Sequence, residues 1–397
     1  MSTVVGTEDD AFREQVRGWL AEHLAGEWAS LKGVGGSGSG EYMREERRAW
    51  NRHLAEHGWT CLGWPEEYGG RGLSLTQQVI FHEEYARADA PELINHLGEQ
   101  LLGPTLIELG SDEQKDRFLP SIRTVDELWC QGYSEPGAGS DLAAVSTRAV
   151  LDEAADEWVV DGQKVWTSWA QEADWIFVIA RTEPGSSRHH GLSFLLVPMD
   201  QDGVEVRPIR QITGGHEFNE VFLSEARTPA SMIVGEPGDG WKVAMALLGF
   251  ERGVSVLGQQ VEFERELGDL IELARSNGAL DDPVLRDRLA AQSAEFEVMR
   301  VNAVRSLTHA TPGADNVAKL VWAGWHKRLG ELAMEVCGAG SLTLRQAQGG
   351  PAERNDLDRW QNLFLFSRAD TLYGGSDEIQ RNILAERVLG LPKEARG

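Results

Sequence analysis

Residues 129–142 read WCQGYSEPGAGSDL, and they mark the point where the pattern of the sequence changes. Before them, apolar residues recur every four positions from Phe12 to Leu24, which is the spacing of an amphipathic helix. After them come short runs rich in Val, Ile, Trp and Phe, at 157–160, 164–168, 175–182, 192–199, 204–209 and 220–225. Six such runs between turn signals predict an antiparallel sandwich or barrel.

The segment GEPGDGW at 235–241 ends the β-rich region, and a helical period then continues to the end of the chain. Helices are predicted at 241–276, 282–308, 315–337, 357–372 and 375–388. Because long helices with one apolar face pack together, these should form a bundle. The sequence therefore predicts an α+β multidomain protein, with an N-terminal helical domain at 1–125, a middle β-domain at 126–235 and a C-terminal helical bundle at 236–397.

The chain of 397 residues carries 38 basic and 63 acidic side chains, for a formal net charge of −25. Nucleic acids and anionic membranes both attract clustered Lys and Arg, so this balance argues against either partner. Three cysteines far apart, and a start without a basic and apolar leader, favour a reducing, cytoplasmic location. No apolar stretch has the length of a membrane span. No metal site is predicted, because His189 and His190 are adjacent in a hydrophilic turn and no HExxH helix is present.

Small residues surround Ser140 in the segment at 129–142, and they let the backbone approach a ligand closely while offering N–H groups to it. Tyr133, Ser134 and Ser140 add hydroxyl groups that can bind the same ligand. Composition alone is also compatible with a Gly-rich loop that leads into a β-domain.

Motifs along the whole chain resemble those of one enzyme family. GYSEPGAGSD at 132–141 resembles the first signature of the acyl-CoA dehydrogenase family, and WTS at 166–168 resembles its second β-domain motif. YGGSDEIQRNILAERVLGLP at 373–392 resembles its C-terminal signature, while WPEEYGGRG at 64–72 and GEPGDGWKVAM at 235–245 match further family segments. The fold implied by this resemblance is an N-terminal helical domain, a middle β-barrel-like domain and a C-terminal four-helix bundle.

The resemblance implies an FAD-dependent oxidoreductase that converts an acyl-CoA thioester to the 2,3-enoyl-CoA. A carboxylate removes the α-proton, the β-hydrogen passes to flavin N5 as a hydride, and an electron-transfer flavoprotein is the implied electron acceptor. By their places in the family motifs, the implied flavin-binding residues are Tyr133, Ser134, Ser140, Trp166, Ser168, Ser376 and Glu378. Ser140 and Arg252 are implied at the substrate, although a surface ion pair is the alternative role of Arg252.

The family offers two places for the catalytic base. Many members carry it directly before the Gly-Thr of the C-terminal signature, where this chain has Gly374. Branched-chain and long-chain members instead carry a Glu before an Arg on the first C-terminal helix, and Glu251-Arg252 matches that pattern. Its neighbours are apolar, and desolvation makes a carboxylate more basic. Glu251 is the predicted base, and an ion pair with Arg252 or another neighbour is its alternative role. Asp377 and Glu378, which follow the Gly-Ser of the C-terminal signature, are the weaker candidates for the base.

Two segments depart from the family pattern. RSNG at 275–278 replaces the usual Arg-x-x-Phe-Gly, and EVCGA at 335–339 replaces Gln-Val-x-Gly-Gly. Both normally lie near the FAD pyrophosphate of a neighbouring subunit, where a Glu is unfavourable. This resembles a subset from actinobacterial steroid side-chain degradation, in which two different subunits form an α2β2 assembly with fewer FAD sites than subunits. The expected assembly is a homodimer or homotetramer first, and a heterotetramer second, with this chain as a half-site or non-catalytic partner.

Two other functions of flavin-binding relatives are disfavoured. Nucleic-acid protection needs a basic surface or tail, which a net charge of −25 does not favour. Nitroalkane oxidation resembles a site built on Asp, whereas position 251 carries Glu. A base on the first C-terminal helix favours a bulky or branched acyl group.

Overall fold

The computed structural model describes residues 7–35, 43–251, 255–308, 311–343 and 357–393, without the side chains of 7, 251–258, 304 and 306–308. The chain divides into two compact units. Unit 1 comprises residues 1–211 and 216–254, and unit 2 comprises 212–215 and 255–397. Among the described residues, no helix has both the length and the apolar character that crossing a bilayer requires.

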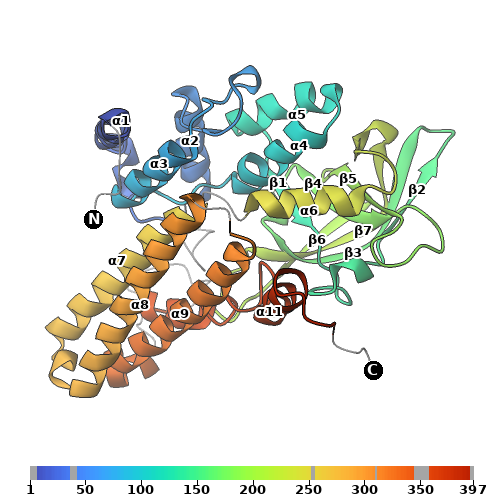
Figure 1. Ribbon diagram of the computed structural model, residues 1–397. Coiled ribbons are helices and arrows are strands. Elements are labelled where there is room, and N and C mark those ends of the chain that lie inside the picture. Colours follow the sequence, from blue (N-terminus) through green and yellow to red (C-terminus); the bar gives the residue numbers. More distant parts are fainter. Residues whose placement is uncertain (1–6, 36–42, 252–254, 309–310, 344–356, 394–397) are drawn as a thin grey trace. The chain divides into compact units, whose positions relative to one another are not determined.

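The first part of unit 1 is helical (Figure 1). Its elements are α1 (Thr7–His23), α2 (Arg44–Glu56), α3 (Leu75–Arg87), the π-helical segment η3 (Leu97–Leu102), α4 (Gly103–Leu109) and α5 (Asp112–Thr124). Capping boxes at Ser74 and Ser111 begin α3 and α5 by satisfying backbone N–H groups of the first turn. The apolar faces of α1, α2 and α3 share one core cluster around Trp50, which is fully buried.

One sheet of eight strands makes up most of the rest of unit 1. The strands are β1 (Trp129–Gly132), β2 (Arg148–Asp152), β3 (Glu157–Ser168), β4 (Trp175–Arg181), β5 (Leu192–Pro198), β6 (Val204–Ile209), β7 (Phe218–Pro229) and β8 (Ile233–Val234). Their order is β6-β7-β3-β2-β4-β5-β8, with β1 paired to β4. Neighbours are antiparallel, except that β4 pairs in parallel with β1 and β2.

The sheet differs from the sequence-based expectation in two respects. The predicted runs at 157–160 and 164–168 are the two halves of the single strand β3, which a register shift interrupts. The sequence pattern did not indicate β1, β2 or β8. Two of them have only four and two residues, too few for an alternating pattern to emerge, and β2 is largely exposed.

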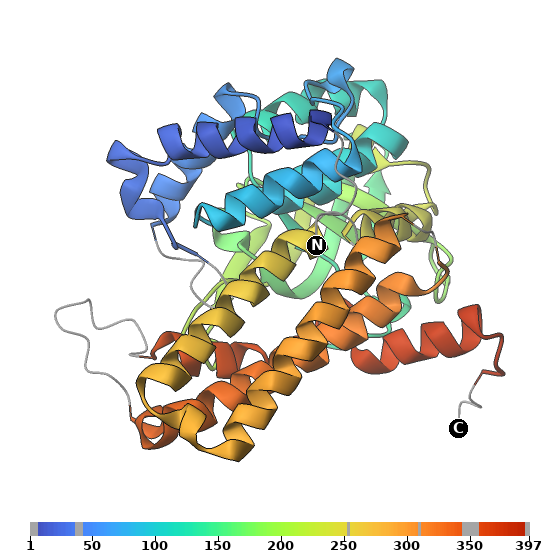
Figure 2. The same cartoon turned by 60° about the vertical axis from the view of Figure 1, so that its left-hand side comes forward.

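Helix α6 (Gly240–Glu251) completes unit 1, and the remaining helices form unit 2. These are α7 (Ser255–Ser276), α8 (Pro283–Thr308), α9 (Ala314–Cys337), α10 (Arg359–Phe366) and α11 (Asp377–Ile383). Figure 2 shows α7, α8 and α9 lying side by side, and α10 packs on α9. They enclose one apolar core that contains Leu270, Phe296 and Trp325. The helix predicted over 241–276 is two helices in different units, and the intervening 252–254 lie outside the described residues.

Candidate functional site

The bulge in β3 presents an aromatic side chain to solvent. The pairing of β3 with β7 shifts register between Lys164 and Thr167, and Trp166 within this shift has a left-handed φ of 60°. That conformation costs a non-glycine residue on the order of 1–2 kcal/mol. Trp166 is 57% exposed, with Phe218 meeting it edge-to-face at 6.3 Å between ring centroids. A strained backbone that exposes a large ring is typical of a ligand site.

The Gly-rich loop lies beside this bulge. The backbone N–H of Val165 donates to the carbonyl oxygen of Ser134 at 2.9 Å, which fixes the start of the loop against β3. Tyr133 is buried and packs edge-to-face on Phe177 and Phe194. Farther along, Ser140 is exposed. The structure therefore places Tyr133 and Ser134 beside the bulge that carries Trp166; that they bind a common ligand stays a prediction.

A buried ion pair holds the loop in place. The Lys164 ammonium donates to Glu135 Oε1 at 2.8 Å and also to the carbonyl oxygens of Tyr133 and Ile179. Glu135 in turn accepts hydrogen bonds from the backbone N–H groups of Ser146 and of the residue after it. The Lys164 charge and these hydrogen bonds outweigh burial and keep the pKa of Glu135 well below its usual value. Both ends of the loop are thus tied to one carboxylate.

The shape around the bulge fits a flat ligand with polar edges. Among the described residues, Thr167 Oγ1 is a buried hydroxyl without a hydrogen-bond partner. Ser168 is half-buried at the end of β3. At Gly137 and Gly139 an added Cβ would meet no atom within 4 Å, so the loop backbone there is open to a ligand. An exposed indole face, hydroxyl groups and free loop backbone are the contacts that a ring system with hydrogen-bonding edges requires.

Helix α6 is fixed in the same unit by its close approach to β5. A Cβ at Gly240 would lie 2.4 Å from the Ser193 carbonyl carbon, so only glycine lets the helix begin this close to β5. Val243 and Leu247 then pack into the core cluster that also contains Tyr133. Glu251, the predicted base, is the last residue of α6, and its side chain lies outside the described part of the structure. Arg252 also lies outside the described residues.

Sequence analysis did not identify Glu99 as a candidate. This residue lies in η3, a π-helical segment that packs on α6. Burial raises the pKa of the Glu99 carboxyl to about 7, although it accepts a hydrogen bond from the Cys61 N–H at 2.6 Å. Short π-helical segments are frequent at functional sites. The only sequence signal was an acidic residue between Leu97 and Leu101 in an apolar stretch, and nothing in that pattern predicts a π-helix.

The C-terminal signature belongs to unit 2, whereas the candidates described so far belong to unit 1. Ser376 is buried and caps α11, because its hydroxyl oxygen accepts from the Ile379 N–H. Glu378 is exposed in the first turn of the same helix. Before them, Gly374 and Gly375 both have left-handed backbones, with φ of 61° and 84°. The signature therefore forms a tight glycine turn that leads into a capped helix.

The two segments that depart from the family pattern both carry ion pairs. Arg275 pairs with Glu272 one turn earlier on α7. Glu335 on α9 pairs with Arg288 of α8. The acidic residue that replaces the usual glutamine is therefore accompanied by a cation from the adjoining helix.

Family models match the chain along most of its length. The N-terminal domain model of the acyl-CoA dehydrogenases matches residues 6–126, the middle domain model matches 130–226, and the C-terminal domain model matches 238–389. The exact limits of the three predicted domains stay a prediction.

Individual relatives are similar over nearly the whole chain. Acyl-CoA dehydrogenase IpdE1 of Mycobacterium tuberculosis is 61% identical over 391 residues, covering 98% of this chain and 99% of that protein. IpdE1 of Mycolicibacterium smegmatis is 59% identical, with 98% and 100% covered. Among solved structures, the Tcur3481-Tcur3483 steroid ACAD has a TM-score of 0.83 at 31% identity, covering 99% and 100%. The ChsE4-ChsE5 complex of M. tuberculosis has a TM-score of 0.79 at 30% identity, again covering 99% and 100%.

Proposed function

The chain belongs to the acyl-CoA dehydrogenase family, whose members are FAD-dependent oxidoreductases, and from this premise we propose that Glu251 starts the reaction by taking the α-proton of an acyl-CoA thioester. The product would be the 2,3-enoyl-CoA. The observation that carries the proposal is the helix α6, which packs on the unit 1 core and ends at Glu251.

The residues around the β3 bulge fit the flavin. Trp166 offers an exposed ring face, while Ser168, Tyr133, Ser134 and Ser140 offer hydroxyl and backbone groups to its edges. From unit 2, the family resemblance adds Ser376 and Glu378 to the proposed set. Bound FAD supplies the two-electron acceptor of the reaction. The ion pair beneath the loop keeps these groups in position before the ligand arrives, which lowers the ordering cost of binding.

The position of residue 251 suits a base. In helical register it follows Val243 and Leu247 at intervals of four, and both of those residues are buried in the core. A carboxylate next to apolar surroundings holds its proton more strongly than one in water, as a base near neutral pH must. Gly374, at the alternative position, has no side chain to accept a proton. Ser140 and Arg252 are the proposed contacts of the CoA thioester.

The substrate is proposed to be a bulky, ring-bearing acyl-CoA. Support comes from the Tcur3481-Tcur3483 structure, which is described as a steroid ACAD and is 31% identical to this chain. A base on the first C-terminal helix, the position used by branched-chain and long-chain members, also favours a bulky acyl group. We further propose a cytoplasmic enzyme whose electrons pass to an electron-transfer flavoprotein.

A second candidate function is that of one subunit in an enzyme built from two different chains. Two similar solved structures, Tcur3481-Tcur3483 and ChsE4-ChsE5, are complexes of this kind. Glu335, in place of the family's glutamine, also favours it. A homodimer or homotetramer is the simpler alternative. Flavin content distinguishes the homo-oligomer from the enzyme built of two different chains. About one FAD per chain in protein purified alone would exclude the half-site function.

The test is anaerobic mixing of the purified protein with a panel of straight, branched and steroid acyl-CoAs, followed by the loss of flavin absorbance. Wild type should bleach with at least one bulky substrate. Glu251→Gln should retain flavin but bleach slower by roughly 10²–10⁴-fold, the usual loss for a general base. Glu153→Gln, an exposed glutamate on a surface turn, is the matched control and should behave as wild type. Unchanged bleaching in Glu251→Gln would place the base elsewhere.

A further inference from the structure

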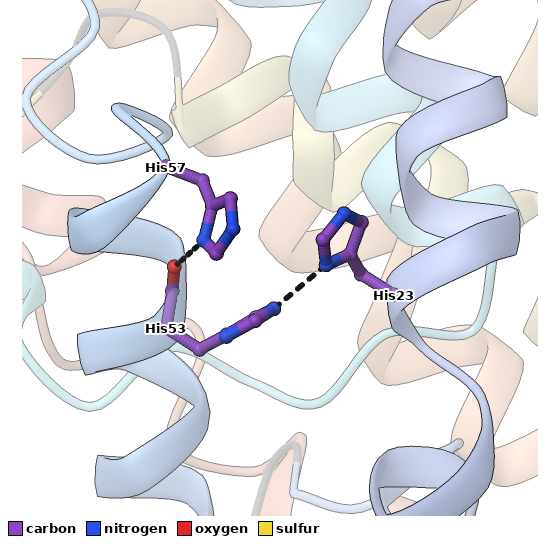
Figure 3. A group of neighbouring side chains, drawn as sticks. All are labelled: His23, His53 and His57. Atoms are coloured by element: carbon purple, nitrogen blue, oxygen red, sulfur yellow. Dashed lines mark hydrogen bonds between the residues drawn. The ribbon is translucent and has the colours of Figure 1, made fainter.

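Three histidines far from the proposed chemistry in sequence meet at the ends of two helices (Figure 3). His23 is the last residue of α1, His53 lies in the last turn of α2, and His57 directly follows that helix. Each offers a ring nitrogen, and the three nitrogens lie within 4.8 Å of one another. The closest pair is His23 Nδ1 and His53 Nε2, at 2.9 Å.

The hydrogen bond of His57 selects the nitrogen that faces the group. Its Nδ1 lies 2.8 Å from the carbonyl oxygen of His53, and a carbonyl can only accept, so Nδ1 carries the proton and donates. The neutral ring then has its lone pair on Nε2. Histidine ligands of metal ions commonly donate their second nitrogen to a backbone carbonyl in this way, which fixes both tautomer and ring orientation.

Aromatic side chains restrict the three rings. Trp19 stacks on His23 with 4.3 Å between centroids and 15° between planes. The same indole lies 5.8 Å from the His53 ring and 5.6 Å from the His57 ring, and Trp50 also stacks on His53, at 5.6 Å between centroids. Because the rings are held by their neighbours, little side-chain entropy remains to be lost when a ligand binds between them.

The charged groups around the three histidines suit a cation as well. Burial, together with the imidazoles of His57 and His23, lowers the pKa of His53. The carboxylates of Glu56 and Glu27 act on His53 in the opposite direction, and their negative charge favours a bound cation over an empty site. His57 is exposed, which gives an ion a path from solvent.

We propose that His23, His53 and His57 form a binding site for one divalent transition-metal ion, with Zn²⁺ as the physiological occupant and water in the fourth position. Imidazole nitrogen suits Zn²⁺, and three protein ligands with an open position are a common zinc arrangement. Zn–N bonds of about 2.0–2.1 Å separate tetrahedral ligand atoms by roughly 3.3 Å. The nitrogens therefore need only small ring movements to reach this geometry.

The proposal departs from the sequence-based expectation of no metal site. That expectation rested on the absence of an HExxH helix, whereas this group joins the ends of two helices. The pair His53 and His57, four residues apart, was the available signal. Bound metal would link the end of α1 to the end of α2. Its role would be to stabilise the N-terminal helices, and it would take no part in the redox reaction.

The test uses full-length, flavin-loaded protein without a histidine tag, treated with a chelator and then titrated with ZnCl₂ by calorimetry. One Zn²⁺ per chain should bind with a Kd in the micromolar range or below. His57→Gln should weaken binding at least 100-fold, and since His57 is exposed, this change should leave the fold intact. His190→Gln, an exposed histidine in a surface turn, is the matched control and should bind as wild type.

Two further measurements keep the test decisive if a variant folds poorly. In wild type, Cu²⁺ should quench tryptophan fluorescence at one equivalent, because Trp19 stacks on His23. Zn²⁺, but not Mg²⁺, should raise the thermal unfolding midpoint, and chelator should reverse the rise. Binding only at millimolar Zn²⁺, or equal affinity in wild type and His57→Gln, would overturn the proposal. The rate of acyl-CoA oxidation should be the same with and without Zn²⁺, so the result is independent of the proposed function.

Discussion

The two places where family members carry the catalytic carboxylate differ in backbone as much as in side chain. At the end of α6, an unbroken helix that starts at Gly240 and packs through Leu247 leads to Glu251. At the C-terminal signature, Gly374 and Gly375 form a turn with two consecutive left-handed backbones. The first place accepts any helical residue, whereas the second is built for glycine.

The contacts of the glycine turn support this difference. An added Cβ at Gly375 would lie 2.4 Å from Gln380 Nε2, which donates to the carbonyl oxygens of both glycines. Tyr373, just before the turn, donates its hydroxyl to Asp370 at 2.7 Å. The absence of a carboxylate at position 374 therefore goes together with a left-handed backbone that favours glycine. Moving the proposed base to α6 is therefore more than the exchange of one side chain.

The largest expected effect comes from trying to move the base back. The double variant E251Q/G374E should stay at least 100-fold below wild type, in line with the roughly 10²–10⁴-fold contribution of a general base. A glutamate with φ near the 61° of Gly374 is strained, which disfavours one defined placement of its carboxylate. Stopped-flow bleaching of the flavin measures the rate. Recovery to within tenfold of wild type would remove the distinction between the two places.

A second prediction tests whether the Gly-rich loop of unit 1 depends on its buried ion pair. Replacing Lys164 by Met should lower the free energy of unfolding by roughly 3–5 kcal/mol, because Glu135 would remain buried without its partner. The loop that starts at Tyr133 should loosen, so the variant should also lose flavin during purification. Urea unfolding and FAD absorbance measure the two effects. Lys32→Met, at an exposed position of the same unit, should change neither.

The glycine turn at 374–375 is held by a different buried group, the imidazole of His326. His326 Nδ1 lies 2.6 Å from Asp370 Oδ2, and its Nε2 lies 3.0 Å from Glu266 Oε2. Burial alone would lower the pKa of His326, but the hydrogen bonds and charges of these carboxylates raise it to about 9. Since Asp370 also accepts from Tyr373, the charged histidine anchors the glycine turn to α9.

The third prediction follows from this raised pKa. A histidine with a pKa of 6.5 unfolded and about 9 folded contributes on the order of 3 kcal/mol below pH 6.5, and loses it as the pH rises through 9. His326→Gln should therefore have a much lower free energy of unfolding than wild type at pH 6. The difference between the two free energies should become smaller towards pH 10. Urea unfolding at pH 6, 8 and 10 measures it. A gap that does not change with pH would mean that His326 is not charged in the folded protein.

The sequence predicted the elements of the fold better than their local conformations. Helices and most strands followed from periodicity and local signals, and the family from the resemblance of its motifs. The left-handed backbone of Trp166 did not, because a bulge depends on the pairing of β3 with β7, which lies more than fifty residues away along the chain. The vacant base position at Gly374 is visible in the sequence, but the left-handed turn that it forms with Gly375 is not. The pKa of Glu99 could not be foreseen, since burial is a property of packing.

Glu99 gives the smallest predicted effect and the sharpest check on Glu251. Among the described glutamates, Glu99 is the one whose pKa is raised towards neutrality, to about 7, and its segment packs against α6, so it is the natural rival base. Glu99→Gln keeps the acceptor for the Cys61 N–H and should change the bleaching rate by less than tenfold. A loss of 100-fold would transfer the base to η3.

Stability gives an independent measurement on the same variant. An acid with a raised pKa favours the folded state only while it is protonated, so wild type should lose stability as the pH rises from about 4.5 through 7. Above pH 7, Glu99→Gln should be more stable by on the order of 2–3 kcal/mol, and near pH 4.5 the two should be alike. Thermal unfolding at pH 5 and pH 8 checks the sign. If the variant gains nothing at pH 8, the pKa of Glu99 is not raised in the folded protein, and the reason for treating it as a rival base is gone.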